Sequence, residues 1–233
     1  MLINMSSSRK RILVVFLVAC CLLSFTGSVL AASPTERIQD SVGVLQEMFG
    51  QPDMEAGVVL LQKAKGVAIF PAVIKAGIMI GGRYGEGLVL IRDDKGRWYG
   101  PHFVKIKGVS YGLQFGAQST ALVMVITNAN GLKGFTGDKV TIGGEIAVAA
   151  GPVGRSGSAA TDSKLQAAIY SYSLSKGAFA GLSLEGSIIE VDEKSNAEYW
   201  GKEISPEKAL ASKASSPEIK PLIIELQNLI ASK

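Results

Sequence analysis

Apolar residues recur at helical spacing near both ends of the chain. Residues 33–36 read SPTE, a serine cap followed by proline at the first helical position and by glutamate three residues after the cap, and a helical stripe follows them. A glycine–proline break ends this helix, and we expect Asp53 to cap a second helix that stops at Gly66. Ser205 is predicted to start a short helix, and the stripe over residues 219–230 predicts an amphipathic helix.

The apolar period changes to two after Gly66, which predicts β-strands. The clearest alternation covers residues 109–118, and residues 170–175 alternate in the same way. Further short strands are expected at residues 67–70, 77–81, 87–91 and 121–127. The DDKG sequence at residues 93–96 predicts a hairpin turn. Many short strands with close turns predict an α+β fold, in which N-terminal and C-terminal helices pack on a curved or barrel-like, mostly antiparallel β-sheet.

Glycines are spaced by four residues along two of these strands. One row is Gly77, Gly81 and Gly85, and the other is formed by residues 108, 112 and 116. Four residues along a strand return to the same face, so each row lacks side chains. Such a row suits strong sheet curvature or the close approach of a strand, helix or ligand, and we favour curvature over ligand approach.

The first 31 residues have the organisation of a secretory signal peptide. A basic run at residues 9–11 precedes an apolar stretch at residues 12–25, and a small-x-small cleavage pattern ends at Ala31. This pattern predicts an exported protein of the periplasm or cell envelope, with residues 32–233 as a single domain. A lipobox reading stays open, in which Cys20 carries the lipid, although the residues after it stay apolar where mature lipoproteins turn polar.

Charge becomes uneven once the leader is set aside. The formal net charge of +4 loses three basic residues there, so the remainder is nearly neutral and does not indicate nucleic-acid binding. Residues 63–107, which we call the basic segment, carry most of the remaining positive charge. Its cations are Lys63, Lys65, Lys75, Arg83, Arg92, Lys95, Arg97, Lys105 and Lys107. This segment predicts a surface for anionic headgroups, the alternative being a merely solvated face.

Three aromatic residues, Trp98, Tyr99 and Phe103, lie within the basic segment. Aromatic rings beside cations suit a membrane interface, and they suit an ordinary core equally well. His102 is the one histidine of the chain, and without partners it is expected to be structural. No phosphate-binding loop, dinucleotide fingerprint, zinc motif or nucleophile elbow occurs, so we expect no cofactor, no metal site and no enzymatic activity.

Several ordered blocks resemble the SYLF family. They are residues 64–70 (AKGVAIF), 75–77 (KAG) with 82–83 (GR), 147–155 (AVAAGPVGR), and 169–186 from IYSYS to SLEG. The resemblance covers roughly residues 35–230, and it implies a lipid-binding domain. The basic residues on the matching blocks are therefore candidates for headgroup contact: Lys65, Lys75, Arg83, Arg155 and Lys176.

The family resemblance also suggests partners. Eukaryotic members bind phosphoinositides and fungal members also bind actin, whereas an exported chain is separated from any cytoskeleton, so actin is not expected. For a bacterial envelope the resemblance implies phosphatidylglycerol, cardiolipin or phosphatidic acid as ligands. Eukaryotic members engage membranes through an amphipathic N-terminal helix; here that helix carries Glu36, Asp40 and Glu47 against only Arg37, which argues against the same contact. The alternative function is a structural or assembly protein of the envelope that acts through protein–protein contacts.

Overall fold

Two long strands, β1 (Gly66–Arg92) and β2 (Trp98–Ile126), form the centre of the sheet. The computed structural model describes residues 32–152, 167–175, 178–179 and 184–232. The predicted signal peptide, with Cys20 and the Ala31 cleavage position, lies outside these residues. Residues 32–233 form a compact unit of their own.

The two long strands are joined by the hairpin turn that the sequence predicts. β1 pairs with β2 in antiparallel register from Gly66 opposite Ile126 to Arg92 opposite Trp98. In the turn, the Asp93 N–H donates to the Arg97 carbonyl at 2.9 Å, and Asp93 Oδ1 accepts the Arg97 N–H at 2.8 Å. Gly96 has φ +78°, a backbone conformation that glycine adopts without strain.

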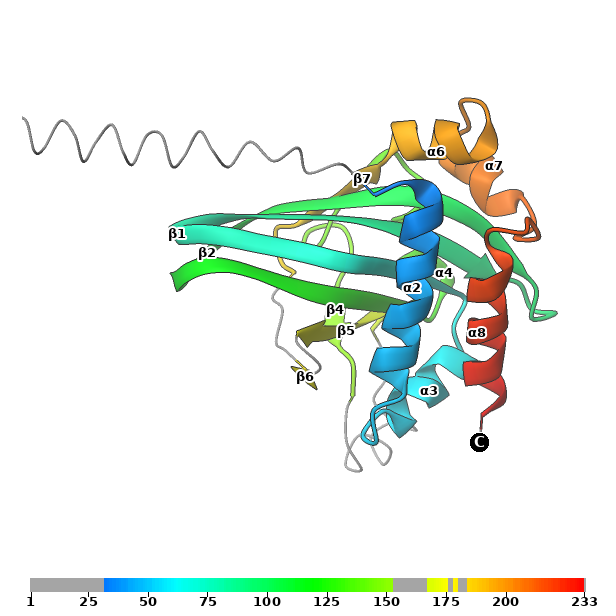
Figure 1. The fold of residues 1–233 in the computed structure, drawn as a ribbon, viewed down its shortest axis with the longest axis horizontal. Coiled ribbons are helices and arrows are strands. Elements are labelled where there is room, and N and C mark those ends of the chain that lie inside the picture. The colour runs from blue at the N-terminus through cyan, green and yellow to red at the C-terminus, as the bar shows by residue number, and fades with distance from the viewer. Residues whose placement is uncertain (1–31, 153–166, 176–177, 180–183, 233) are drawn as a thin grey trace, which may run out of the picture. The chain divides into compact units, whose positions relative to one another are not determined.

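Both long strands reverse direction at their middle, so β1 comes to lie against itself. A Cβ atom placed on Gly87 would be 2.4 Å from the Ile69 carbonyl oxygen, and one placed on Gly85 would be 2.9 Å from the Ala72 oxygen. Figure 1 shows β1 and β2 running together to one end of the sheet and back. We call the reversing part, residues 76–82 and 108–118, the fold-back tip.

The prediction of separate short strands in this region is wrong. Residues 67–70, 77–81 and 87–91 belong to one strand, and residues 109–118 and 121–127 fall on another that ends at Ile126. Glycine lets the paired ribbon bend without a loop, because it tolerates close backbone contact. At Gly85 the glycine row therefore serves the close approach of a strand.

Five shorter strands extend the sheet to the sides of this ribbon. On one side β7 (Ile188–Val191) pairs with the first half of β2, and β3 (Lys139–Thr141) pairs with β7. On the other side β5 (Ile169–Ser175) pairs with the second half of β2, β6 (Ala178–Phe179) pairs with β5, and β4 (Val148–Ala150) runs parallel to β5. The sheet is thus curled and mostly antiparallel, as predicted.

The two faces of the sheet cover different hydrophobic cores. The outer face packs against α2 (Pro34–Phe49), α3 (Glu55–Gln62) and α8 (Lys220–Ala231), which Figure 1 shows lying together over the strands. The inner face curls around a second core, to which every strand except β6 contributes apolar side chains. Both cores are formed by residues of the compact unit 32–233.

The helix ends show which local sequence signals predict a helix start correctly. Ser33 caps α2 in a full capping box, as predicted. The prediction that Asp53 caps α3 is wrong, because the N-cap is Met54, whose side chain is buried in the outer core instead. Ser205 caps α7 (Pro206–Ala211), and the stripe of α8 packs mainly on α2 and α3. None of the described helices has the length and apolar character needed to span a bilayer.

Two further helices were not expected from the sequence. α4 (Ala129–Lys133) is a single short turn, and α6 (Glu193–Trp200) is capped by the Asp192 side chain. Most residues of α6 are polar, so its sequence has no apolar stripe from which a helix could be predicted.

A buried ion network anchors α2 to the sheet. The Arg37 side chain is 1 % exposed, and its guanidinium contacts Glu86 Oε2 of β1 at 2.6 Å and Asp192 Oδ2 at 3.1 Å. Lys105 of β2 reaches the other Asp192 oxygen at 2.8 Å. Burial alone would raise the pKa of Asp192, but hydrogen bonds from Lys105 and Ser195 and the charge of Arg37 hold it below its usual value.

We expect the Arg37→Met variant to lose about 3–5 kcal/mol of unfolding free energy, because it leaves buried carboxylates with fewer partners. Urea denaturation of residues 32–233 measures this loss. The matched control is Arg97→Met, which breaks an exposed pair with Asp93 and should have a much smaller effect. Equal losses in the two variants would contradict an anchoring role for Arg37.

Candidate functional site

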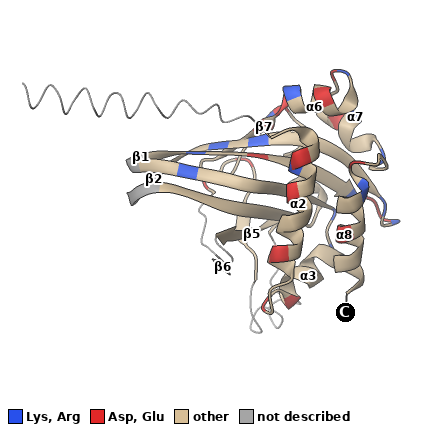
Figure 2. Cartoon of the chain, viewed as in Figure 1, with Lys and Arg blue, Asp and Glu red and all other residues tan. Residues whose placement is uncertain are grey.

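The cations of the basic segment do not form one surface. One group surrounds the hairpin turn, where Lys65 pairs with Asp94 and Arg97 pairs with Asp93. A second group lies on the first half of β2, where Lys105 and Lys107 pair with acidic residues near or on β7. Figure 2 shows lysine and arginine positions spread singly along the strands. The expected single basic surface is therefore wrong. Four of the nine cations are paired with carboxylates, two of them within the segment and two with residues that are distant in the sequence.

The candidate residues near the hairpin turn do not form an anion-binding site, because they are paired with carboxylates or buried in the core. Lys65 is half-exposed beside Asp94. Trp98 and Phe103 are buried in the outer core, which favours the core alternative for these two rings over a membrane interface. Tyr99 is half-buried, and its hydroxyl donates to Asp93 Oδ2 at 3.1 Å. Arg155 and Lys176 lie outside the described residues.

Lys75 and Arg83 are brought together on the inner face. They lie on the two halves of β1, which approach each other where Gly85 meets Val73. From this approach we infer that Arg83 and Lys75, each two residues nearer the fold-back tip, are neighbours. Strand pairing adds residues 118 and 120 of β2 to the same face, and Gly108 opposite Arg83 contacts Ser187. We call the resulting group the inner-face cluster; its members are Lys75, Arg83, Gln118, Thr120 and Ser187.

Arg83 is a buried cation without a described counter-ion. Its exposed fraction is 6 %, and its Nη1 donates to the Ser187 hydroxyl at 2.5 Å. Its Nε has no hydrogen-bond partner, and no carboxylate of the described ranges forms an ion pair with it. Burial lowers the pKa of Arg83. Burying a charge without a partner is unfavourable, so this position is suited to receive an anion.

The neighbours of Arg83 are also suited to an anion. Lys75 is half-buried and has no ion pair within the described part of the chain, while Gln118 is exposed, so the cluster opens to solvent on that side. Guanidinium groups bind phosphate with two parallel N–H donors, and an ammonium adds a point charge. Sequence reasoning found both cations through their family blocks. It missed Ser187, which comes from a distant strand end, and strand alternation could have found Gln118.

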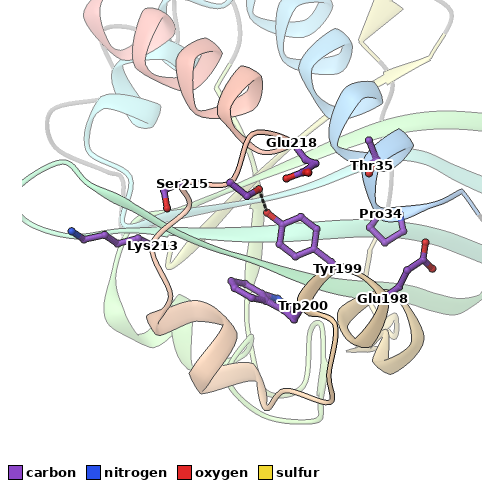
Figure 3. Close-up of a pocket in the computed structure, with 9 residues that line it drawn as sticks. Pro34, Thr35, Glu198, Tyr199, Trp200, Lys213, Ser215 and Glu218 are labelled. Carbon is purple, nitrogen blue, oxygen red and sulfur yellow. Dashed lines mark hydrogen bonds between the residues drawn. The ribbon is translucent and has the colours of Figure 1, made fainter.

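A separate cavity lies where the N-terminal end of α2 meets α6 (Figure 3). It has a volume of about 470 Å³, and the Tyr199 hydroxyl and the Ser216 hydroxyl are 2.6 Å apart at its wall. Glu198 and Glu218 line it against a single lysine, Lys213. This balance of charge is unsuited to a phosphate group.

The described residues offer little for catalysis or metal binding. Among them, no three histidine, cysteine, aspartate or glutamate side chains are grouped to hold a metal ion. His102 is fully buried, and burial lowers its pKa to about 4, so the imidazole is neutral near pH 7. The inner-face cluster itself contains neither a carboxylate nor an imidazole.

A comparison with protein families gives one match. Residues 107–229, more than half of the chain, match the Ysc84 family, described as "Las17-binding protein actin regulator". The match covers most of β2, the later elements up to residue 229 in α8, and three members of the inner-face cluster, Gln118, Thr120 and Ser187. It does not include Lys75 and Arg83.

Similar proteins come from yeasts and animals. Over 173 residues the chain is 34 % identical to "LAS seventeen-binding protein 3" of Saccharomyces cerevisiae, covering 72 % of this chain and 38 % of that protein. It is 36 % identical over 145 residues to "SH3 domain-containing YSC84-like protein 1" of Xenopus laevis, covering 62 % and 43 %. The Rattus norvegicus protein of that name is 32 % identical over 183 residues, covering 78 % and 54 %. The chain thus spans about half or less of the length of these relatives.

The lowered pKa of His102 predicts a specific dependence of stability on pH. An unfolded histidine takes up its proton near pH 6.5, whereas the folded protein resists protonation until about pH 4. The unfolding free energy should therefore be highest above pH 6.5 and should fall by roughly 3 kcal/mol as the pH drops from 6.5 to 4. Denaturant unfolding across this range measures the fall.

Carboxylates also titrate in this range, so the comparison is with a variant that lacks the imidazole. His102→Phe should show a shallower pH slope between 4 and 6.5, whatever its stability at pH 7; His102→Gln serves if the phenylalanine variant folds poorly. Parallel slopes in the native chain and the variant would contradict a buried neutral His102.

Proposed function

The chain belongs to the SYLF (Ysc84) family, and on this premise we propose that it binds anionic phospholipid headgroups at a membrane surface without catalysing a reaction. The observation that carries the proposal is the buried guanidinium of Arg83, which has no counter-ion in the described part of the chain. A phosphate oxygen would supply that missing negative charge. Lys75 would add a second charge from the neighbouring half of β1.

The chemistry of the inner-face cluster supports binding rather than bond-making. Arg83 and Lys75 supply charged donors, while the Ser187 and Thr120 hydroxyls and the Gln118 amide supply neutral ones. A general acid–base reaction needs a group that exchanges protons near neutral pH, and the cluster has none. Recognition here would rest on electrostatics and hydrogen bonds to phosphate.

The proposal places the protein at a cell-envelope membrane. The leader pattern of residues 1–31 supports export, either by cleavage at Ala31 or with lipid attached to Cys20. In that setting phosphatidylglycerol, cardiolipin and phosphatidic acid are the expected ligands. Actin is not proposed as a partner, because an exported chain does not meet it.

The alternative is a binding protein whose partner is another protein of the envelope. The family description and the name of the Saccharomyces cerevisiae relative favour it, because both name binding to Las17. Crosslinking in membranes, followed by identification of the crosslinked species, separates the two functions. A dominant protein partner that is captured equally well without anionic lipid would favour the alternative.

Arg83→Met tests the lipid proposal directly. Removing a buried charge that has no counter-ion among the described residues should leave the unfolding free energy unchanged or raise it. Loss of a charge-assisted hydrogen bond, about 1.5–3 kcal/mol, should nevertheless weaken binding to phosphatidylglycerol-containing vesicles by about tenfold or more. Vesicle flotation of residues 32–233 at physiological salt measures binding, and urea denaturation measures stability.

The matched control is Arg97→Met, which removes the same charge from an arginine of the hairpin turn that is paired with Asp93. It should weaken vesicle binding by about fivefold at most, in line with about 1 kcal/mol for a basic residue near an anionic surface. Equal flotation of the native chain with neutral and anionic vesicles would reject the proposal. Equal effects of the two variants would show that net charge, not the inner-face cluster, determines binding.

A further inference from the structure

The fold-back tip carries no charged residue. Its two segments read AGIMIGG at residues 76–82 and GVSYGLQFGAQ at residues 108–118. Both belong to the ribbon where β1 and β2 reverse together at one end of the sheet (Figure 1). The two segments combine isoleucine, methionine, leucine and aromatic residues with glycine and a few uncharged polar residues. A long uncharged and largely apolar sequence at one end of a ribbon is typical of a segment that meets a partner or a membrane.

Cations stand immediately behind this tip. Along the four strand segments that lead away from it, the first charged residue is Lys75 on one, Arg83 on the next and Lys107 on the third. The fourth segment, residues 119–126, has no charged residue. Acidic residues come only after these cations, where Glu86 pairs with Arg37 and Glu190 pairs with Lys107. We call Lys75, Arg83 and Lys107 the cationic collar.

Apolar side chains are exposed beside the collar on the outer face. Val109 is 56 % exposed, Ile74 is 42 % exposed and Tyr84 is 40 % exposed. Tyr84 lies directly across from Lys107 in the strand register. Gly82 has open space around the position of a Cβ atom. The outer helices therefore leave this end of the sheet uncovered.

We propose that the fold-back tip inserts into the interfacial layer of an anionic bilayer, with the cationic collar at the level of the lipid phosphates. This inference rests on the proposed function and names the surface that would perform it. The order along the ribbon, apolar end first and cations second, is the order that a bilayer presents from hydrocarbon to phosphate. Binding to a protein partner would not require the first charged residue along each strand segment behind the tip to be positive.

The dimensions agree with this orientation. The collar residues of β1 lie about four residues from Met79, which is roughly 13 Å at about 3.3 Å per residue. The headgroup layer on each side of a bilayer is about 5–8 Å thick. A tip inserted upright to the collar would thus pass the headgroups and reach the edge of the hydrocarbon. Arg83, on the inner face of the curl, would meet a phosphate from inside the sheet.

Site-specific labelling tests the inference. Residues 32–233 contain no cysteine, because both cysteines of the chain are Cys20 and Cys21. An environment-sensitive fluorophore on Val109→Cys should shift its emission to the blue when phosphatidylglycerol-containing vesicles are added, and lipids with nitroxide-labelled acyl chains should quench it. The same fluorophore on Gln39→Cys, an exposed position of α2, should stay in water.

A substitution separates tip insertion from headgroup binding. Val109→Asp should lower vesicle binding at least tenfold, while binding of a soluble short-chain phosphatidylglycerol stays unchanged. Arg83→Met should weaken both. Vesicle binding without a blue shift at position 109 would overturn tip insertion and leave the proposed function standing. Absence of binding to both vesicles and short-chain lipid would overturn both.

Discussion

The close approach of the two halves of β1 is the constraint on which the sheet and its candidate site depend. Where Gly85 and Gly87 cross the other half of β1, any larger residue would meet backbone oxygen atoms. This approach makes the paired ribbon turn back on itself, which produces the fold-back tip. It also brings close together the two halves of β1 that carry Arg83 and Lys75, which are eight positions apart in the sequence. A loop at the same point would have separated them.

Arg37 and Arg83, the buried arginines among the described residues, have opposite environments. Arg37 has two carboxylates, a serine hydroxyl and two backbone carbonyl groups as partners, and it joins α2 to β1 and α6. Its charge is fully compensated, so its role is structural. Arg83 has one described hydroxyl partner and no described carboxylate. This contrast between the two guanidinium groups is the basis of the proposal that Arg83 receives an anion from outside.

Local signals in the sequence were sufficient for much of the fold. The capping box at Ser33, the turn at residues 93–96 and the stripe of α8 depend on neighbours within a few positions, and each is present in the structure. The fold-back could not be predicted in this way, because alternation continues through a glycine bend and marks no strand end. The number of strands predicted for the centre of the sheet was therefore higher than the number observed.

The candidate site was predictable only in part, for a related reason. Counting charges along the basic segment ignores partners that arrive from distant elements, such as Asp192 for Lys105 and Glu190 for Lys107. With the two pairs at the turn, four of the nine cations have a counter-ion among the described residues. Lys75 and Arg83 are among the five that have none, because the residues that face them across the sheet are glycine, glutamine and serine rather than acidic. Ser187 comes from outside the segment, so no local pattern could reveal it.

The charges that α2 presents to solvent make its side of the molecule unsuited to an anionic surface. The apolar stripe of α2 packs into the outer core, and its one arginine is buried. The helix therefore presents Glu36, Asp40 and Glu47 to solvent (Figure 2). An anionic bilayer repels such a face, and insertion of α2 would have to break the Arg37 network and open the outer core. The fold-back tip has no acidic residue, has cations behind it and needs no rearrangement to be reached. Electrostatics and packing therefore favour the same end of the sheet.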